Sequence, residues 1–208
     1  MNVLAIGAHF DDVEIGCGGA LAKHRAEGDD VTVLVITDSD YADNLANFSR
    51  QKKTALKEGK AAAKILGYNL ICGNMDTREV EFDPTLVDLI EKVIYEKSID
   101  FIYTHWDQDV HQDHQNVGKA SLAAGRKQQR LLMYRSNLYL NSRRFDENFF
   151  VDISDFIELK IKAIGAHKSE VEKFGERWLE FWEQEARTNG LRCGTGYAEV
   201  YQVVKYFL

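Results

Sequence analysis

The chain has 208 residues, of which 45% are hydrophobic and 28% charged, and its formal net charge at pH 7 is -7. This length and composition are enough to bury one core, so we expect residues 1–208 to form a single domain. The acidic balance argues against a nucleic-acid partner, because proteins that bind the phosphate backbone usually present a basic face. No apolar run reaches about 18 residues and no signal-like segment opens the chain, so we expect a cytoplasmic protein without membrane insertion.

Strands and helices are predicted to alternate along the chain. Strands are expected at short apolar runs, and helices where apolar residues recur with a helical period. The predicted strands are residues 3–8, 31–37, 69–72, 99–104, 131–134, 149–151 and 199–206. The predicted helices are residues 18–27, 50–66, 85–97, 116–124, 155–166 and 170–186. This alternation is typical of a Rossmann-like, three-layer α/β domain with a mostly parallel sheet and helices on both faces.

A dense charged cluster follows the first predicted strand. Within six residues it holds His9, Asp11, Asp12 and Glu14. Burying such charges at the tip of a strand is costly without compensation, and a bound cation is the usual compensation. The cluster therefore points to a metal site.

A second cluster, His111, Asp113 and His114, follows the fourth predicted strand. In a doubly wound sheet with strand order 3-2-1-4-5, strands 1 and 4 are neighbours, and their connections diverge to opposite faces. The crevice at that point is where such folds bind ligands. We therefore expect the two clusters to form one divalent-metal site at the carboxyl ends of strands 1 and 4.

Two histidines, one carboxylate and a water molecule would make a catalytic zinc site. Spacing alone does not choose the ligands, since more candidates are present than one ion needs. The candidates are His9, Asp11, Asp12, Glu14, His105, Asp107, Asp109, His111, Asp113 and His114. Of these we expect His105, Asp107 and Asp109 to be solvated loop groups.

The glycine-rich segment 16–19 does not fit a dinucleotide-binding turn, because the charged cluster separates it from the first strand. Its glycines are expected to let the following helix pack close to the sheet. The three cysteines, Cys17, Cys72 and Cys193, lack the spacing of a zinc site or a disulfide framework. We expect them to be small buried residues.

The two clusters resemble the signatures of the PIG-L or LmbE-like zinc-dependent N-deacetylases, which act on N-acetylglucosaminyl compounds. Residues 8–14 are similar to the AHPDDE signature of that family, with Phe10 where proline is usual and an additional residue before the glutamate. Residues 111–114 match its HxDH signature. The resemblance continues through the glycine-rich segment to residues 166–169 and 197–199, so it covers nearly the whole chain.

The resemblance implies a role for each matched position. It makes His9, Asp12 and His114 the ligands of one zinc ion, for which other divalent metals could substitute. Asp11 would be the general base and then the general acid. A protonated His111 would stabilise the oxyanion, and Asp113 would hold a histidine in place.

Three further positions are candidates for binding substrate: Glu14, Arg50 and Asp76. Arg50, predicted to open a helix, matches a family position that contacts substrate, and Asp76 could accept a sugar hydroxyl. His167 and Glu199 also match family positions, without a role that we can assign.

The implied activity is removal of an acetyl group from the amide nitrogen of an N-acetylglucosamine-type sugar or related small metabolite. Two alternatives stay open: a metal-dependent phosphoesterase, since Asp- and His-rich strand ends also build two-metal sites, and a non-catalytic metal-binding protein. The acidic and aromatic segment 176–182 is predicted to pack against the body or a second subunit. A homo-oligomer is therefore expected.

Overall fold

In the computed structural model, which describes residues 1–43 and 48–207, seven strands form a central sheet in the order β5-β2-β1-β6-β7-β9-β8. Five of the strands run parallel: β1 (Asn2–Gly7), β2 (Asp30–Thr37), β5 (Asn69–Met75), β6 (Phe101–His105) and β7 (Arg130–Tyr134). The last two, β9 (Ala198–Tyr206) and β8 (Phe149–Asp152), pair antiparallel at one edge. The predicted α/β class and the predicted order 3-2-1-4-5 of the parallel strands are both confirmed.

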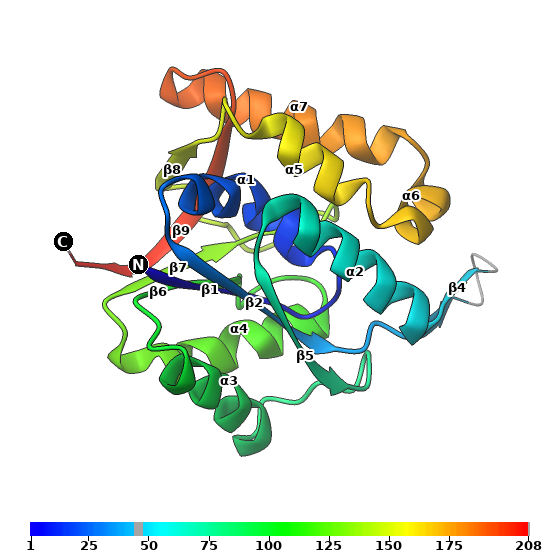
Figure 1. Cartoon of the computed structure of the whole chain (residues 1–208), viewed down its shortest axis with the longest axis vertical. Coiled ribbons are helices and arrows are strands. Elements are labelled where there is room, and N and C mark those ends of the chain that lie inside the picture. Colours follow the sequence, from blue (N-terminus) through cyan, green and yellow to red (C-terminus); the bar gives the residue numbers. More distant parts are fainter. Residues whose placement is uncertain (44–47, 208) are drawn as a thin grey trace.

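Helices cover both faces of this sheet (Figure 1). One face carries α1 (Asp12–Ala26), α2 (Lys52–Leu66) and α5 (Ile157–Ile164), together with α6 (Lys168–Phe174) and α7 (Arg177–Cys193). The other face carries α3 (Pro84–Glu96) and α4 (Gln112–Ala124), which leads into the 3-10 turn η1 (Gly125–Lys127). Among the residues described, no helix combines the length and apolar character needed to cross a membrane.

The central strands are apolar throughout because each faces a helix layer on both sides. In β1, Val3 and Ala5 join the core beneath α1 and α2, whereas Leu4 and Ile6 join the core beneath α3 and α4. All four side chains are fully buried. Burying one Val, Leu or Ile side chain contributes about 1.5–3 kcal/mol, so the strands that carry the charged clusters are held firmly on both faces.

Two helices begin earlier than predicted, immediately after the charged clusters. Helix α1 starts at Asp12 rather than at residue 18, and α4 starts at Gln112 rather than at residue 116. Glycines disfavour a helix when propensity alone is considered, but close packing leaves no room for a side chain at Gly16 or Gly19. A Cβ atom on Gly16 would lie 2.0 Å from the ring of Tyr134 in β7. The prediction that these glycines permit close packing on the sheet is confirmed.

The predicted helix 170–186 is two helices. Gly175, with φ 78°, separates α6 from α7, because glycine adopts this left-handed conformation at little cost. Trp178 and Trp182 of α7 pack on Ile15 and Ile164 and are 5% and 3% exposed. The predicted packing of this segment against the body is confirmed, and these two side chains need no second subunit for their burial.

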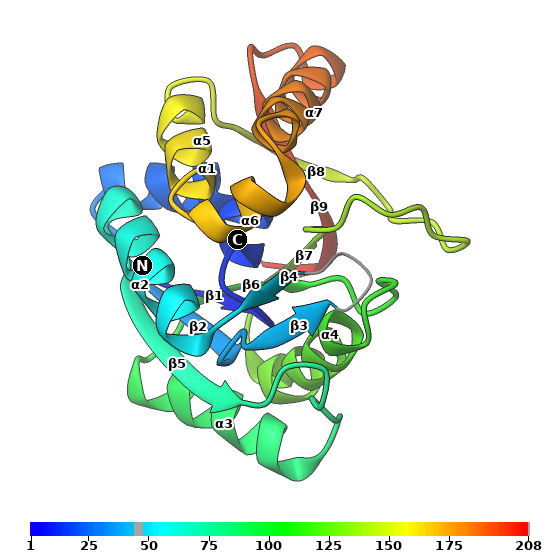
Figure 2. The same cartoon turned by 90° about the vertical axis from the view of Figure 1, so that its right-hand side faces the viewer.

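A small hairpin was not predicted. It consists of β3 (Tyr41–Asp43) and β4 (Phe48–Arg50), which pair antiparallel outside the main sheet (Figure 2). Strands of three residues carry too little pattern to be read from sequence. Arg50 therefore ends a strand, and the prediction that it opens a helix is wrong; α2 begins at Lys52.

The cysteines differ from one another in burial. Cys17 is buried as predicted, but Cys72 is half-buried and Cys193 is exposed. Cys193 is the last residue of α7, where the helix ends at Gly194 in a left-handed conformation. The expectation that all three are buried was wrong because it took no account of their positions in the elements.

Candidate active site

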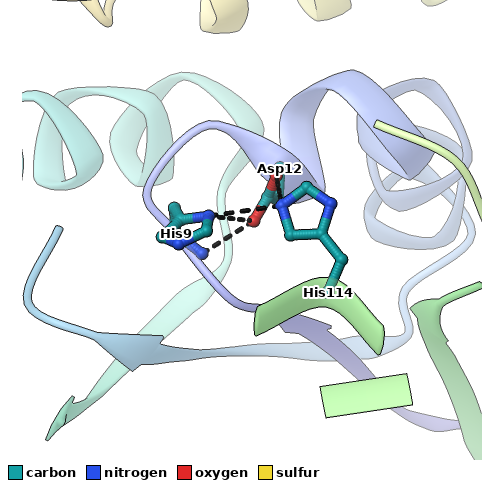
Figure 3. Close-up of side chains that lie close together, drawn as sticks. All are labelled: His9, Asp12 and His114. Atoms are coloured by element: carbon teal, nitrogen blue, oxygen red, sulfur yellow. Dashed lines mark hydrogen bonds and ion pairs between the residues drawn. The ribbon is translucent and has the colours of Figure 1, made fainter. Parts of the chain in front are cut away.

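The carboxyl ends of β1 and β6 bring His9, Asp12 and His114 together (Figure 3). Nδ1 of His9 lies 3.3 Å from Nε2 of His114 and 3.4 Å from Oδ2 of Asp12. Nε2 of His114 lies 3.2 Å from Oδ1 of Asp12. A tetrahedral zinc ion with bonds of about 2.0–2.1 Å has its ligands about 3.3 Å apart. The two imidazole nitrogens have this spacing, and each faces one oxygen of the Asp12 carboxylate. One ligand atom from each residue lies within 4.8 Å of the others, so the three side chains could hold one ion.

The electrostatics of the cluster also favour a cation. Burial lowers the pKa of His114, but Asp12 and Asp109 outweigh it and raise that pKa to about 10. Burial likewise lowers the pKa of His9, and Asp113 with Asp12 raises it to about 9. Burial raises the pKa of Asp12, yet the neighbouring imidazoles hold it well below its usual range. The surrounding carboxylates thus attract positive charge, and a divalent ion would displace the imidazole protons.

Asp113 fixes the orientation of one of these imidazoles. Its Oδ2 lies 2.9 Å from Nε2 of His9 and also accepts the amide of Arg78 at 2.8 Å. With Nε2 donating to a carboxylate, Nδ1 of His9 is free to face His114 and Asp12. A second group of potential ligands, His9, His111 and Asp113, shares this same histidine, so the two groups overlap and do not form independent sites.

Two residues expected to be solvated are in fact buried beside the cluster. His105 is fully buried, stacks on His114 with ring centroids 4.1 Å apart, and has Nε2 3.1 Å from Oδ2 of Asp12. Asp109 is 4% exposed, with Oδ1 3.4 Å from Nδ1 of His114. The prediction that they are solvated was therefore wrong for His105 and Asp109. Asp107 is half-buried. For His105 the sequence did hold a signal of burial, because the apolar strand continues directly into this residue.

Asp11 lies between β1 and α1 with φ 120°, a backbone conformation that non-glycine residues rarely adopt and that is common at functional sites. The residue lines the cavity described below. Burial, followed by the charges of Asp12 and Glu170, raises its pKa to about 7, against the opposing effects of Arg50 and His167. A carboxyl group with a pKa near neutrality can both accept and return a proton.

His111 caps α4 from the cavity side. Its Nδ1 accepts the amide of Asp113 at 3.2 Å, and its ring centroid lies 4.8 Å from that of His9 and 4.7 Å from that of His114. Burial and the two neighbouring histidines lower its pKa to about 4. Without a bound metal the neutral imidazole is therefore favoured, and the protonated form expected during catalysis stays a prediction. Because Nδ1 is an acceptor, we assign the single ring proton to Nε2.

A cavity of about 280 Å³ opens onto these groups. The cluster and Asp11 form one side of it. The other side comes from the β3–β4 hairpin, from the loops after β5 and β7, and from α6 and α7. Side chains in this wall include Tyr41, Arg78, Leu138, Tyr139, Glu170, Lys173, Phe174, Trp178 and Trp182.

The three candidate substrate-binding residues occupy different places. Arg50 lines the cavity but is only 2% exposed, because it donates to the Phe10 carbonyl at 2.9 Å and pairs with Glu58 at 3.0 Å. Glu14 is 2% exposed and lies outside the cavity lining. Asp76 is exposed and borders a separate surface depression. The fold brings only Arg50 of the three to the cavity.

His167 and Glu14 belong to a buried network behind the cavity. Nδ1 of His167 lies 3.2 Å from a guanidinium nitrogen of Arg50, and its Nε2 lies 3.4 Å from Oε2 of Glu14. Tyr68 donates to the other oxygen of Glu14. Burial raises the pKa of Glu14, but His167 and Tyr68 outweigh it and lower that pKa below its ordinary value. Through its contact with Arg50, this buried network packs behind the lining of the cavity.

Several known proteins are similar to this chain in sequence or in fold. The diacetylchitobiose deacetylase of Thermococcus kodakarensis is 31% identical over 214 residues, covering 93% of this chain and 78% of the relative. The conserved protein TT1542 of Thermus thermophilus has a TM-score of 0.83 at 23% identity, covering 99% of this chain and 95% of that one. GalB, the 4-carboxy-2-hydroxymuconate hydratase of Pseudomonas putida, has a TM-score of 0.82 at 20% identity, covering 100% and 97%.

The match to a protein family covers more than half of the chain. Residues 4–125 match PIG-L, described as GlcNAc-PI de-N-acetylase. This range includes both charged clusters and every side chain of the metal-binding group. The chain therefore belongs to the PIG-L family of de-N-acetylases.

Proposed function

We propose that this chain is a zinc-dependent hydrolase that removes an acetyl group from the amide nitrogen of an N-acetylglucosamine-type sugar or a related small metabolite. The observation that carries the proposal is the set of donor atoms of His9, Asp12 and His114, 3.2–3.4 Å apart, with Asp11 and His111 lining the same cavity. Membership of a de-N-acetylase family and the relation to a diacetylchitobiose deacetylase support the substrate class.

A zinc ion bound there would polarise the amide carbonyl and lower the pKa of a water molecule. Asp11 would accept the proton of the attacking water, since it lines the cavity together with Asp12 and its pKa is raised to about 7 by burial and by the charges of Asp12 and Glu170. The same carboxyl group then returns a proton to the leaving amine, which leaves as the free sugar amine while acetate forms. Neither step needs a second acid.

His111 contributes as a hydrogen-bond donor. We expect its Nε2–H to bond the oxyanion that develops as the carbonyl carbon becomes tetrahedral. Losing one such donor typically costs about 3–4 kcal/mol of transition-state stabilisation. Asp113 acts indirectly, by holding His9 through the 2.9 Å contact.

The fold alone does not determine the reaction, since GalB, a hydratase, shares it. The site argues for amide hydrolysis, because a proton-shuttling carboxyl group and an oxyanion donor stand beside one metal-binding group. A two-metal phosphoesterase holds two ions about 3.5–4 Å apart, and a neutral imidazole has one free lone pair and so binds only one of them. Within residues 1–43 and 48–207 the overlapping groups at this cavity share His9, which favours one ion.

The test combines metal analysis with product detection. Protein purified without chelators is assayed for metal content and for acetate release from N-acetylglucosamine, diacetylchitobiose and other N-acetylated sugars. About one zinc per chain with acetate release supports the proposal. Two metals per chain with phosphate release from esters would replace it with the phosphoesterase. Zinc binding without turnover on a panel of amides, esters and unsaturated acids would favour a non-catalytic protein.

The Asp11→Asn variant tests whether Asp11 is the general base. It keeps the shape of the side chain and removes its basicity, so turnover should fall by about 10²–10⁴-fold while zinc stays bound. Full activity in this variant would rule out Asp11 as the base.

A further inference from the structure

Helix α1 is interrupted shortly after it begins. Cys17 has φ -146° and ψ 16°, outside the helical range, so residues 12–16 form a separate first turn. That turn carries Asp12 of the metal-binding group and Ile15 of the cavity wall. The direction of this turn, relative to the rest of α1, therefore decides where Asp12 points.

A carboxylate from the far end of the chain caps the second segment of α1. Oε1 of Glu199, in β9, accepts the amide of Gly19 at 2.8 Å, and Oε2 accepts the amide of Ala20 at 2.8 Å. Counted from the break at Cys17, these are amides of the kind that a helix N-terminus leaves without a helical partner. A negative charge at this place also suits the helix dipole.

A buried lysine completes the arrangement on the other side of the break. Nζ of Lys160, in α5, donates to the carbonyl of Ile15 at 2.5 Å and to Oε1 of Glu199 at 2.6 Å. In an uninterrupted helix the Ile15 carbonyl would instead accept the amide of Gly19. The ion pair thus supplies partners to both groups that a continuous helix would join.

Both members of this pair are buried, and they border a small cavity of about 30 Å³. Lys160 is 2% and Glu199 is 4% exposed, and the hydroxyl of Tyr201 donates to Oε2 of Glu199 at 2.7 Å. Taking two charges out of water costs free energy that a hydrophobic pair of similar volume would not. A general gain in stability is therefore a poor explanation for the pair, whereas fixing one direction of the first turn is a good one.

We propose that Lys160 and Glu199 are positioning residues that hold the first turn of α1 at the angle required for Asp12 to bind zinc with His9 and His114. This inference rests on the proposed function in taking Asp12 as a zinc ligand. Without the pair, the first turn can realign with the rest of the helix and carry the Asp12 carboxylate away from the two imidazoles. Residues outside the family match at 4–125 would then determine the geometry of the ligand set.

The test measures zinc affinity by competition with a chromophoric chelator. The variants are Glu199→Gln, Lys160→Met and the double variant Lys160→Met/Glu199→Met. The double variant leaves no unpaired buried charge and lets α1 form its own hydrogen bonds, so it is expected to fold. The zinc dissociation constant should rise by about 10–100-fold in each, as is typical when residues that orient a metal ligand are changed.

A second readout separates positioning from stability. In cobalt-substituted protein, the visible absorption bands report the coordination geometry, and we expect them to change in all three variants. Leu86→Ala is the matched control, because Leu86 is fully buried in α3 on the opposite face of the sheet. It should lower the melting temperature while leaving both the zinc affinity and the cobalt spectrum unchanged.

Two results would contradict different claims. A folded double variant, or Glu199→Gln alone, with the wild-type zinc affinity and cobalt spectrum would overturn the positioning role of the pair. Unchanged zinc affinity in His114→Ala would instead overturn the proposed metal site. The two failures are therefore distinguishable.

Discussion

Oδ2 of Asp113 lies 2.9 Å from Nε2 of His9, so the carboxylate selects which nitrogen of the imidazole faces Asp12 and His114. We predict that Asp113→Asn weakens zinc binding by about 10–100-fold, because an amide can present its NH₂ group to Nε2 and favour the wrong tautomer. Isothermal titration calorimetry with zinc measures the change in affinity. Asp107→Asn, at a half-buried residue outside the cavity lining, is the control, and equal affinity in both variants would contradict the prediction.

The pH dependence of turnover should report the carboxyl group of Asp11. The active form is the carboxylate, so the rate should fall about tenfold per pH unit as the pH drops below its pKa. That pKa is raised to about 7 by burial and by Asp12 and Glu170. A zinc ion would neutralise Asp12, so in the loaded enzyme we expect an acid limb between the ordinary carboxyl value of 3.8 and this raised value.

Removing a neighbouring carboxylate tests the direction of that shift. Glu170→Gln takes away one of the charges that raise the pKa of Asp11, so the acid limb should move to lower pH. Glu172→Gln, at an exposed residue in the same helix, should leave the limb where it is. A limb that moves to higher pH in Glu170→Gln would contradict this account of Asp11.

Arg50 should matter more for folding than for contact with substrate. Its guanidinium group lies 3.0 Å from Glu58 and 3.4 Å from Glu170, and both carboxylates are buried. Removing one partner of a buried ionic network typically costs about 3–5 kcal/mol. Urea denaturation of metal-free Arg50→Met should show a loss of this size. The exposed Arg187→Ala should change the free energy of unfolding little, and a similarly small change in Arg50→Met would refute the prediction.

Two glycines in α1 should respond to alanine in opposite ways. A Cβ atom at position 16 would lie 2.0 Å from the ring of Tyr134, whereas at position 18 the nearest atoms lie at 3.6 Å. We predict that Gly16→Ala destabilises the fold by at least about 1–3 kcal/mol through overpacking. Gly18→Ala should be neutral or stabilising by about 0.5–1 kcal/mol. Thermal denaturation of the two variants measures the difference, and an equal effect would contradict the packing argument.

Much of the fold and of the site's location followed from the sequence. Alternating apolar strands and helices determine a parallel sheet, and the order of those strands brings residues 9–14 beside residues 111–114. The burial of Asp109 did not follow, because it depends on how the loop after β6 folds back over His114. The burial of His105 could have followed, since this residue is the last of the buried strand β6. The helix break at Cys17 could not be predicted either. The residues that stabilise it, Lys160 and Glu199, lie more than 140 residues away in the sequence and have no recognisable local pattern.

The cavity is assembled from two distant parts of the chain. The proposed ligands and catalytic groups all precede residue 115, whereas much of the facing wall comes from residues 136–182. Substrate range can therefore diverge by changes in the later part without altering the earlier one. Exchanging residues 168–182 between relatives is a route to new specificities, and retaining Lys160, His167 and Glu199 would keep the supports on which the earlier part depends.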